Sequence, residues 1–200
     1  MLGRLVWLAR RVAHRIEYRP GRRALSELRQ RWVVFSHPRA TIRFGERVYV
    51  GPGFSVDIPA NGTLIVGDDC EFRRNCRVEI PGDGRVTIGN GSYLTYNVVL
   101  ACSQSITIGE RCGIGFNCGV YDANHRYRDL SRPFLEQGYE YRPITIEDDA
   151  QIHSNTIIVN NIGTRAVVGA NSVVTKPIPP YVLAAGAPAT PIDEFGPPEP

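Results

Sequence analysis

The sequence of 200 residues predicts an all-β solenoid, a rod of short stacked strands, and three observations support this prediction. Isoleucine, leucine, valine or phenylalanine recurs at every sixth residue in five groups of three. Small residues often follow these apolar positions by four, and glycine often follows by one. The chain also holds 20 glycines and 15 prolines, a composition that favours many turns and few long helices.

Residues 1–40 form a basic segment that differs from the rest of the chain. Residues 1–31 carry a net charge of +7 while the whole chain carries +3, so the remaining residues sum to −4. Apolar residues within 2–16 recur at helical spacing, which predicts an amphipathic helix with arginines on its other face. Such a helix suits an anionic membrane surface, and its apolar stripe equally suits packing on protein; the sequence leaves both open. No nucleic-acid-binding motif accompanies the arginines, so we expect no nucleic-acid partner.

The chain is expected to be cytoplasmic, with a peripheral position at the inner membrane face if residues 1–16 bind lipid. No apolar run reaches 18 residues, which argues against a membrane-spanning helix. Arg10 and Arg11 interrupt the stretch that would form the apolar core of a signal peptide.

Residues 41–178 are predicted to form the solenoid. Six residues are too few for a helix–turn–helix unit, so three six-residue strands close one triangular coil whose apolar positions point inward. Ile42, Val48, Val50 and Val56 predict an irregular first coil. The fifteen inward positions are Val66, Phe72, Val78, Ile88, Leu94, Leu100, Ile108, Ile114, Val120, Ile146, Ile152, Ile158, Ile162, Val168 and Val174.

Four of the five cysteines fall at the small positions of this repeat: Cys70, Cys76, Cys112 and Cys118. They are therefore predicted to be buried fillers. No histidine shares their positions, so we predict no metal site and no metal requirement. Cys102 has no role assigned by the pattern.

An insertion at residues 121–143 leaves the rod between two coils. Successive groups of three begin 22, 20, 38 and 16 residues apart, and the step of 38 equals one coil plus about twenty residues. Long ordered insertions in compact domains are usually functional, and this one contains His125. Residues 179–200 are expected to be a C-terminal cap followed by a loose proline-rich tail at 191–200.

Two stretches, together with the repeat, resemble one family over about residues 45–190. They are Tyr121-Asp-Ala-Asn-His-Arg-Tyr-Arg-Asp129, and residues 169–189 with their Gly-Ala-Pro-Ala ending. The chain resembles the hexapeptide-repeat acyltransferases, in particular their sugar and polysaccharide O-acetyltransferase branch. This resemblance implies a left-handed parallel β-helix and a homotrimer that binds acyl-CoA between subunits. It implies an acyltransferase that moves an acyl group, most simply acetyl, from acyl-CoA to a hydroxyl of a carbohydrate or glycoconjugate acceptor.

The resemblance also assigns residues. His125 would be the general base, because a neutral imidazole can accept a proton near pH 7. Asp122 is the predicted orienter of its ring, and Asn97 and Asn124 are predicted acceptor contacts. No cysteine or serine has the setting of a nucleophile, so direct transfer in a ternary complex is expected. The residues predicted to bind coenzyme A are Ser154, Ala170, Thr175 and Lys176, the last being the only lysine of the sequence.

Some residues depart from the branch. Gln151 stands where the branch usually has tryptophan, and His153 stands where it has glycine. Two alternatives stay open: an N-acyltransferase acting on an amino sugar or another amine, and a non-catalytic solenoid scaffold. A zinc-dependent carbonic anhydrase of the same architecture is disfavoured, because the body lacks three suitably spaced histidines.

Overall fold

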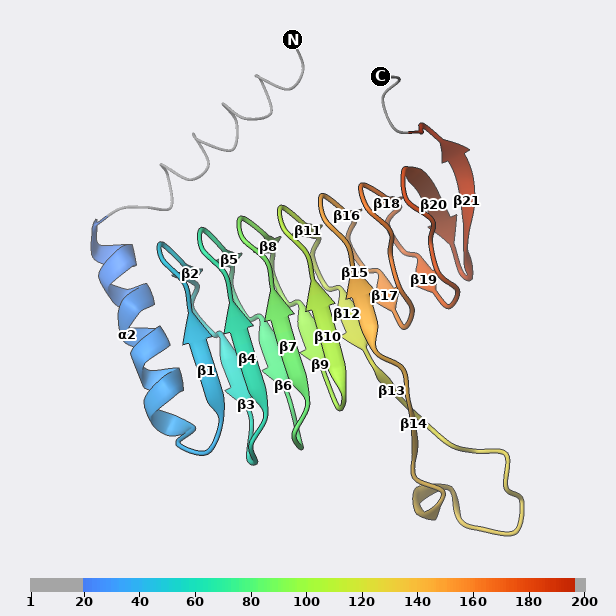
Figure 1. Cartoon of the computed structure of the whole chain (residues 1–200), viewed down its shortest axis with the longest axis horizontal. Helices are drawn as coiled ribbons and strands as arrows, with labels where there is room; N and C mark the ends of the chain where they lie inside the picture. Colours follow the sequence, from blue (N-terminus) through green and yellow to red (C-terminus); the bar gives the residue numbers. More distant parts are fainter. Residues whose placement is uncertain (1–19, 197–200) are drawn as a thin grey trace.

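The structure is a computed structural model that describes residues 20–196 (Figure 1). The amphipathic helix predicted at 2–16 and the membrane contact predicted for residues 1–16 lie outside the described residues. Helix α2 (Pro20–Ser36) stands at the N-terminal end of a rod of stacked coils, whose strands form three mainly parallel sheets. No helix in this described part is long and apolar enough to cross a membrane.

The three sheets form the three sides of the rod. The first contains β1 (Thr41–Phe44), β4 (Thr63–Val66), β7 (Arg85–Ile88), β10 (Ser105–Ile108) and β15 (Ile144–Ile146). The second contains β2 (Tyr49–Val50), β5 (Glu71–Phe72), β8 (Tyr93–Leu94), β11 (Gly113–Ile114), β16 (Gln151–Ile152), β18 (Val167–Val168), β20 (Val182–Gly186) and β21 (Ala189–Glu194). The third contains β3 (Ser55–Asp57), β6 (Arg77–Glu79), β9 (Val99–Ala101), β12 (Gly119–Tyr121), β17 (Ile157–Ile158) and β19 (Val173–Val174).

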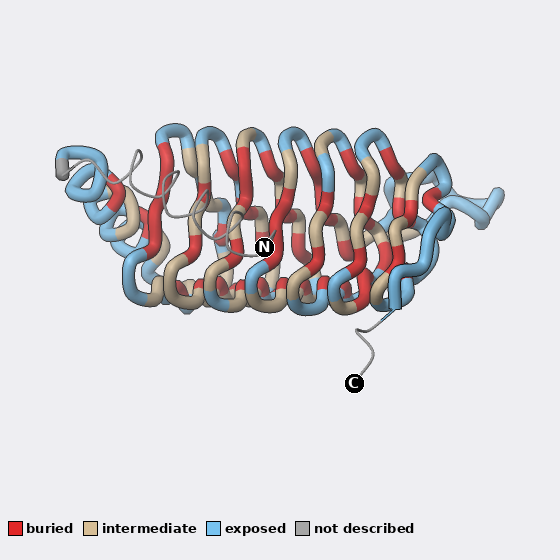
Figure 2. Tube along the Cα trace, turned by 90° about the horizontal axis from the view of Figure 1, so that it is seen from above, coloured by how far each residue is buried: buried red, intermediate tan, exposed pale blue. Residues whose placement is uncertain are grey.

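The six-residue period is confirmed as the pattern of the core. All fifteen predicted inward side chains are buried, none of them more than 2% exposed. Figure 2 shows the buried positions recurring along the strands of successive coils. Strands of neighbouring coils pair in register, as Val66 with Ile88 and Ile88 with Ile108, so apolar side chains stack in columns along the rod axis. This stacking is the main source of stability in a solenoid.

The first and last coils differ from the prediction. Phe44 pairs with Val66, so Phe44, Val50 and Val56 continue the six-residue spacing into the first coil. The predicted Ile42 and Val48 are also buried in its core, and Phe44 is only partly buried. At the other end β20 still pairs in parallel with β18, so the predicted end of the β-helix at residue 178 is too early. The inward residue there is Ala184, which is smaller than the isoleucine, leucine, valine and phenylalanine that define the six-residue pattern.

The predicted loose tail is wrong as far as residue 194. Strand β21 runs antiparallel to β20 and covers the last edge of the second sheet.

At the opposite end, α2 covers the edge strand β2 with polar side chains. Ser26 Oγ accepts a hydrogen bond from Val50 N at 2.8 Å, and Gln30 Nε2 donates to Val48 O at 2.9 Å. Both edges of the second sheet are therefore paired or capped, which opposes edge-to-edge aggregation there.

One corner of the rod is a column of asparagines. Asn75, Asn97, Asn117, Asn155 and Asn171 all have positive φ angles, between 56° and 61°. Asparagine tolerates this left-handed conformation better than most residues do. Each side-chain amide donates to the next asparagine oxygen at 2.9–3.1 Å.

Candidate active site

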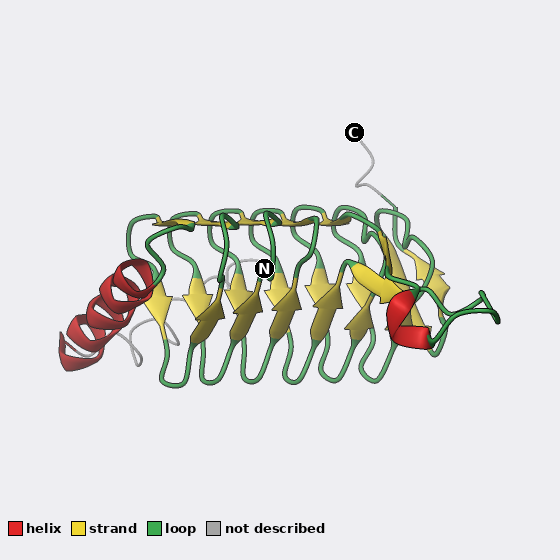
Figure 3. Cartoon of the chain, turned by 90° about the horizontal axis from the view of Figure 1, so that it is seen from below, coloured by secondary structure: helices red, strands yellow, loops and turns green. Residues whose placement is uncertain are grey.

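The predicted insertion contains a hairpin rather than an irregular loop. Strands β13 (Ala123–His125) and β14 (Tyr139–Tyr141) pair antiparallel, and a single 3-10 turn, η1 (Phe134–Glu136), lies in the connection. Figure 3 shows this segment lying off the side of the rod, at the end away from α2. The rod continues without interruption, because β10 pairs directly with β15 across the insertion.

His125 is held in this hairpin by two aromatic rings. Its ring centroid lies 4.2 Å from that of Tyr139, its partner across the hairpin, and 4.9 Å from that of Phe134. Its Nδ1 is buried and has no hydrogen-bond partner among residues 20–196. A buried polar atom without a partner is costly, and Nδ1 of His125 is the one such side-chain atom in the described part of the chain.

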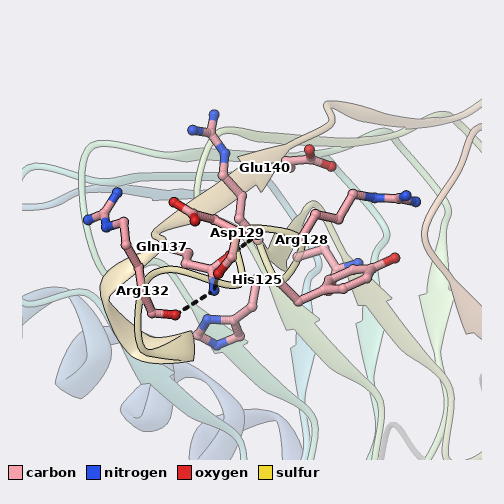
Figure 4. Close-up of a pocket in the computed structure, with 9 residues that line it drawn as sticks. His125, Arg128, Asp129, Arg132, Gln137 and Glu140 are labelled. Carbon is pink, nitrogen blue, oxygen red and sulfur yellow. Dashed lines mark hydrogen bonds between the residues drawn. The ribbon is translucent and has the colours of Figure 1, made fainter.

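A cavity of about 330 Å³ opens beside His125 (Figure 4). Its lining residues are Asn124, His125, Arg126, Tyr127, Arg128, Asp129, Arg132, Gln137 and Glu140. The structure thus brings two predicted site residues, His125 and Asn124, to one cavity. Three arginines against two carboxylates give the lining a small excess of positive charge.

Gln137, one of the lining residues, holds the turn at residues 129–132 through three hydrogen bonds. Its Nε2 donates to the carbonyl oxygens of Asp129 and Arg132, at 2.8 and 3.1 Å, and its Oε1 accepts from the backbone N–H of Asp129 at 3.0 Å. The Ser131 hydroxyl and backbone N–H both donate to Asp129 Oδ1, and these hydrogen bonds hold the pKa of the Asp129 carboxyl below its usual range. Hydrogen bonds among its own polar groups therefore stabilise the segment 129–137.

Asp122 does not contact the His125 ring, which corrects the predicted pairing. Its buried carboxylate accepts backbone N–H groups of three consecutive residues, Ser103, Gln104 and Ser105, at 2.6–2.7 Å. Cys102 Sγ also lies 3.4 Å from Asp122 Oδ2. Asp122 therefore stabilises the coil corner from which the hairpin leaves. A buried carboxylate needs hydrogen-bond donors, and the nearest backbone N–H groups supply them.

Asn97 lies in the asparagine column and not in the cavity. Its amide donates to Asn117 Oδ1 and its oxygen accepts from Asn75 Nδ2. These contacts give Asn97 a structural role, and its predicted contact with an acceptor stays a prediction.

The four residues predicted to bind coenzyme A lie on two corners of the last coils. Ser154 and Ala170 precede Asn155 and Asn171 of the asparagine column, and Ser154 Oγ accepts from Phe116 N at 3.2 Å. Thr175 and Lys176 follow β19 and are exposed. By strand register, Lys176 stands in the column of Asp122, along the corner that carries the hairpin.

All five cysteines are buried: the four predicted fillers, and Cys102, to which the repeat assigned no role. All five are unpaired thiols, and burial raises the pKa of Cys70 and Cys112 to about 11 and of Cys76 and Cys102 to about 12. Such thiols are poor nucleophiles. Within the described range, no group of three histidine, cysteine or acidic side chains is arranged to hold a metal ion.

Sequence reasoning missed Phe134, Gln137 and Tyr139. The alternation of Tyr139 and Tyr141 with charged residues was a strand signal in the sequence. Nothing local indicated that Tyr139 would face His125, because that pairing depends on the register of the hairpin.

No family model matches the chain. The galactoside O-acetyltransferase of Escherichia coli is 35% identical over 112 residues, which cover 55% of this chain and 54% of that protein. The chain spans about half the length of the curated relatives it matches first.

Solved structures match over more of the chain. A hexapeptide-repeat acetyltransferase of Vibrio cholerae, crystallised with acetyl coenzyme A, matches at 27% identity and a TM-score of 0.57, covering 82% of this chain and 75% of that one. A second crystal structure of the same Vibrio protein matches at 30% identity and a TM-score of 0.53, covering 76% and 75%. The predicted left-handed parallel β-helix is thereby confirmed.

Proposed function

The chain belongs to the hexapeptide-repeat acetyltransferases, and from this premise we propose that it transfers an acyl group, most simply acetyl, from acyl-CoA to a hydroxyl of a sugar or glycan. The observation that carries the proposal is His125, whose buried Nδ1 has no hydrogen-bond partner among the described residues and whose ring contacts Tyr139 and Phe134 beside a cavity. The likeness to a galactoside O-acetyltransferase supports a hydroxyl acceptor.

In the proposed reaction His125 is the general base. The imidazole takes the proton of the acceptor hydroxyl while that oxygen attacks the thioester carbonyl carbon of acyl-CoA. The new C–O bond forms, the C–S bond breaks, and the coenzyme A thiolate leaves and takes up the proton held by the imidazolium. No acyl-enzyme is formed, a route supported by the burial and raised pKa values of the cysteines.

Acyl-CoA would bind along the last coils, with Lys176 meeting a phosphate as a point charge. Thr175 would contact the cofactor beside Lys176. Ser154 and Ala170 would contact it at the neighbouring corner of these coils. We further propose a homotrimer. His125 projects from the rod on a hairpin while Lys176 lies on the rod itself, so a neighbouring subunit would bring a cofactor groove to the hairpin.

Product mass spectrometry on the full chain tests this function. Acetyl-, propionyl- and butyryl-CoA are each incubated with a panel of neutral, acidic and amino sugars, and acylated products are identified. We expect O-acylated sugar, and a loss of about 10²–10⁴-fold in turnover for His125→Ala. The matched control is His37→Ala, a histidine whose Nδ1 lies 2.8 Å from Val33 O at the end of α2. Product from amino sugars alone would favour N-acyl transfer, and equal turnover by His125→Ala would reject the mechanism.

A further inference from the structure

Helix α2 turns its more apolar face away from the rod. Its exposed large apolar side chains follow the spacing i, i+3, i+7, i+10, which places them along one face. They are Leu25, Leu28, Trp32 and Phe35, and they are 51%, 59%, 66% and 77% exposed. We call these four residues the α2 stripe. Figure 2 shows α2 exposed along most of its length.

The face of α2 that meets the rod is the more polar one. Ser26 and Gln30 form hydrogen bonds with the backbone of the first coil. Val33 is a buried apolar residue on the same face of the helix. A helix that only capped the rod would place its apolar residues against the core. The reversed arrangement leaves a stripe with two aromatic rings, 6.1 Å apart, that the rod does not cover.

A basic cavity adjoins the stripe. It has a volume of about 310 Å³ and lies between α2 and the corners of the first three coils. Its lining residues are Arg22, Leu25, Arg29, Tyr49, Pro52, Arg73, Arg74 and Tyr96. Four of the eight are arginines and none is acidic, and Leu25 belongs to both the cavity and the α2 stripe.

Two of these arginines are held by other residues, and two have no side-chain partner in the part of the chain that the structure describes. Arg29 Nη1 donates to Val50 O at 3.0 Å, and Arg73 pairs with Glu71 at 2.7 Å. The side chains of Arg22 and Arg74 make no hydrogen bond or ion pair within residues 20–196. Arginine guanidinium groups bind phosphate oxygens through paired N–H donors, so an anion with several oxygens fits this cavity.

We propose that the α2 stripe and this arginine cavity together form a docking surface for an anionic lipid bilayer. The stripe would enter the boundary between headgroups and acyl chains, while the arginines would bind lipid phosphates beside it. A helix with Trp, Phe and Leu on one face and arginines along its edges has the composition of an interfacial helix. Charge complementarity favours lipid over a protein partner, because residues 1–31 carry +7 in a chain whose remainder carries −4. This inference is independent of the proposed acyl transfer.

Fluorescence of the full chain tests the site directly. Trp7 and Trp32 are the two tryptophans, so the Trp7→Phe variant leaves Trp32 as a single reporter in the stripe. Vesicles of phosphatidylcholine with 30% phosphatidylglycerol should shift its emission to the blue and shield it from an aqueous quencher. Pure phosphatidylcholine vesicles and inorganic phosphate alone should leave the emission unchanged. A Trp32 emission that anionic vesicles do not move overturns the proposal.

Vesicle co-sedimentation separates the two parts of the surface. Trp32→Ser with Phe35→Ser, and separately Arg22→Gln with Arg74→Gln, should each raise the lipid concentration for half-binding roughly 10- to 30-fold. The matched controls are Ile192→Ser, an exposed apolar residue of β21, and Arg85→Gln with Arg165→Gln, which removes two exposed arginines elsewhere. Unchanged binding by the stripe variant would place the contact in residues 1–19 and reject the proposal. A smaller oligomer of the stripe variant in light scattering would reject it too, since the stripe would then be a subunit interface.

Discussion

The rings of His125 and Tyr139 face each other across the β13–β14 hairpin with their centroids 4.2 Å apart. Because Nδ1 of His125 makes no hydrogen bond within residues 20–196, ring contacts are what orient the imidazole. Tyr139 is therefore a positioning residue for the proposed base.

Replacing Tyr139 tests this positioning. Tyr139→Ala should lower kcat about 10- to 100-fold with little change in KM for acyl-CoA, because a small displacement of a catalytic group is costly. Tyr139→Phe keeps the ring and should retain most of the activity. Steady-state kinetics measures both. If the Phe variant were as impaired as the Ala variant, the tyrosine hydroxyl and not the ring contact would be the important feature.

Replacing Asp122 tests whether its role is structural. Asp122→Asn removes charge-assisted hydrogen bonds to three backbone N–H groups, and should lower the free energy of unfolding by about 2–4 kcal/mol. Denaturant unfolding measures the change, with Asp83→Asn, an exposed loop carboxylate, as the control. An unchanged stability together with a large loss of turnover would return Asp122 to the role of ring orienter.

Coenzyme A binding tests Lys176 and the scaffold alternative together. Coenzyme A at one hundred times its Kd should stabilise the wild-type chain by about 2.7 kcal/mol. Lys176→Ala should weaken binding about 10-fold, and Lys176→Arg should weaken it less, because the charge is kept. Calorimetry gives the Kd values, with Arg85→Ala as the control. A wild-type chain that coenzyme A does not stabilise would favour a non-catalytic scaffold.

The buried thiols predict a loss of stability at alkaline pH. Burial raises their pKa from the usual 9.0 to about 11 for Cys70 and about 12 for Cys76, so these thiols stay protonated in the folded chain while the unfolded chain ionises. Their contribution is fully present below pH 9 and is lost as the pH rises from about 9 toward 11–12. Unfolding at a series of pH values measures this loss, and a Cys76→Ser variant should lose less of its free energy of unfolding over the same pH range.

Thiol labelling tests the burial of the cysteines directly. At pH 8 a thiol reagent should react with the five cysteines only after denaturation. Rapid labelling of the folded chain would contradict the assigned burial.

The rod could be predicted from the amino-acid sequence, because the same burial pattern repeats in every coil of a solenoid. Each coil buries the same positions, so Ile88, Leu94 and Leu100 are recognisable from their spacing alone. The same logic placed the cysteines among the small residues and located the insertion that carries His125. The pattern did not identify Phe44 and Ala184 in the end coils, although the six-residue spacing continues through both. Phe44 is only partly buried, and Ala184 is a small residue.

The contacts between side chains that are distant in the sequence became known only from the three-dimensional structure. The pairing of His125 with Tyr139 depends on the register of the hairpin. The hydrogen bonds that Asp122 accepts from residues 103–105 depend on which backbone N–H groups the coil corner leaves without another partner. The orientation of α2 likewise follows from Ser26 and Gln30 bonding the open edge of β2, which directs Trp32 outward. Such contacts join residues far apart in the chain, and no short-range periodicity encodes them.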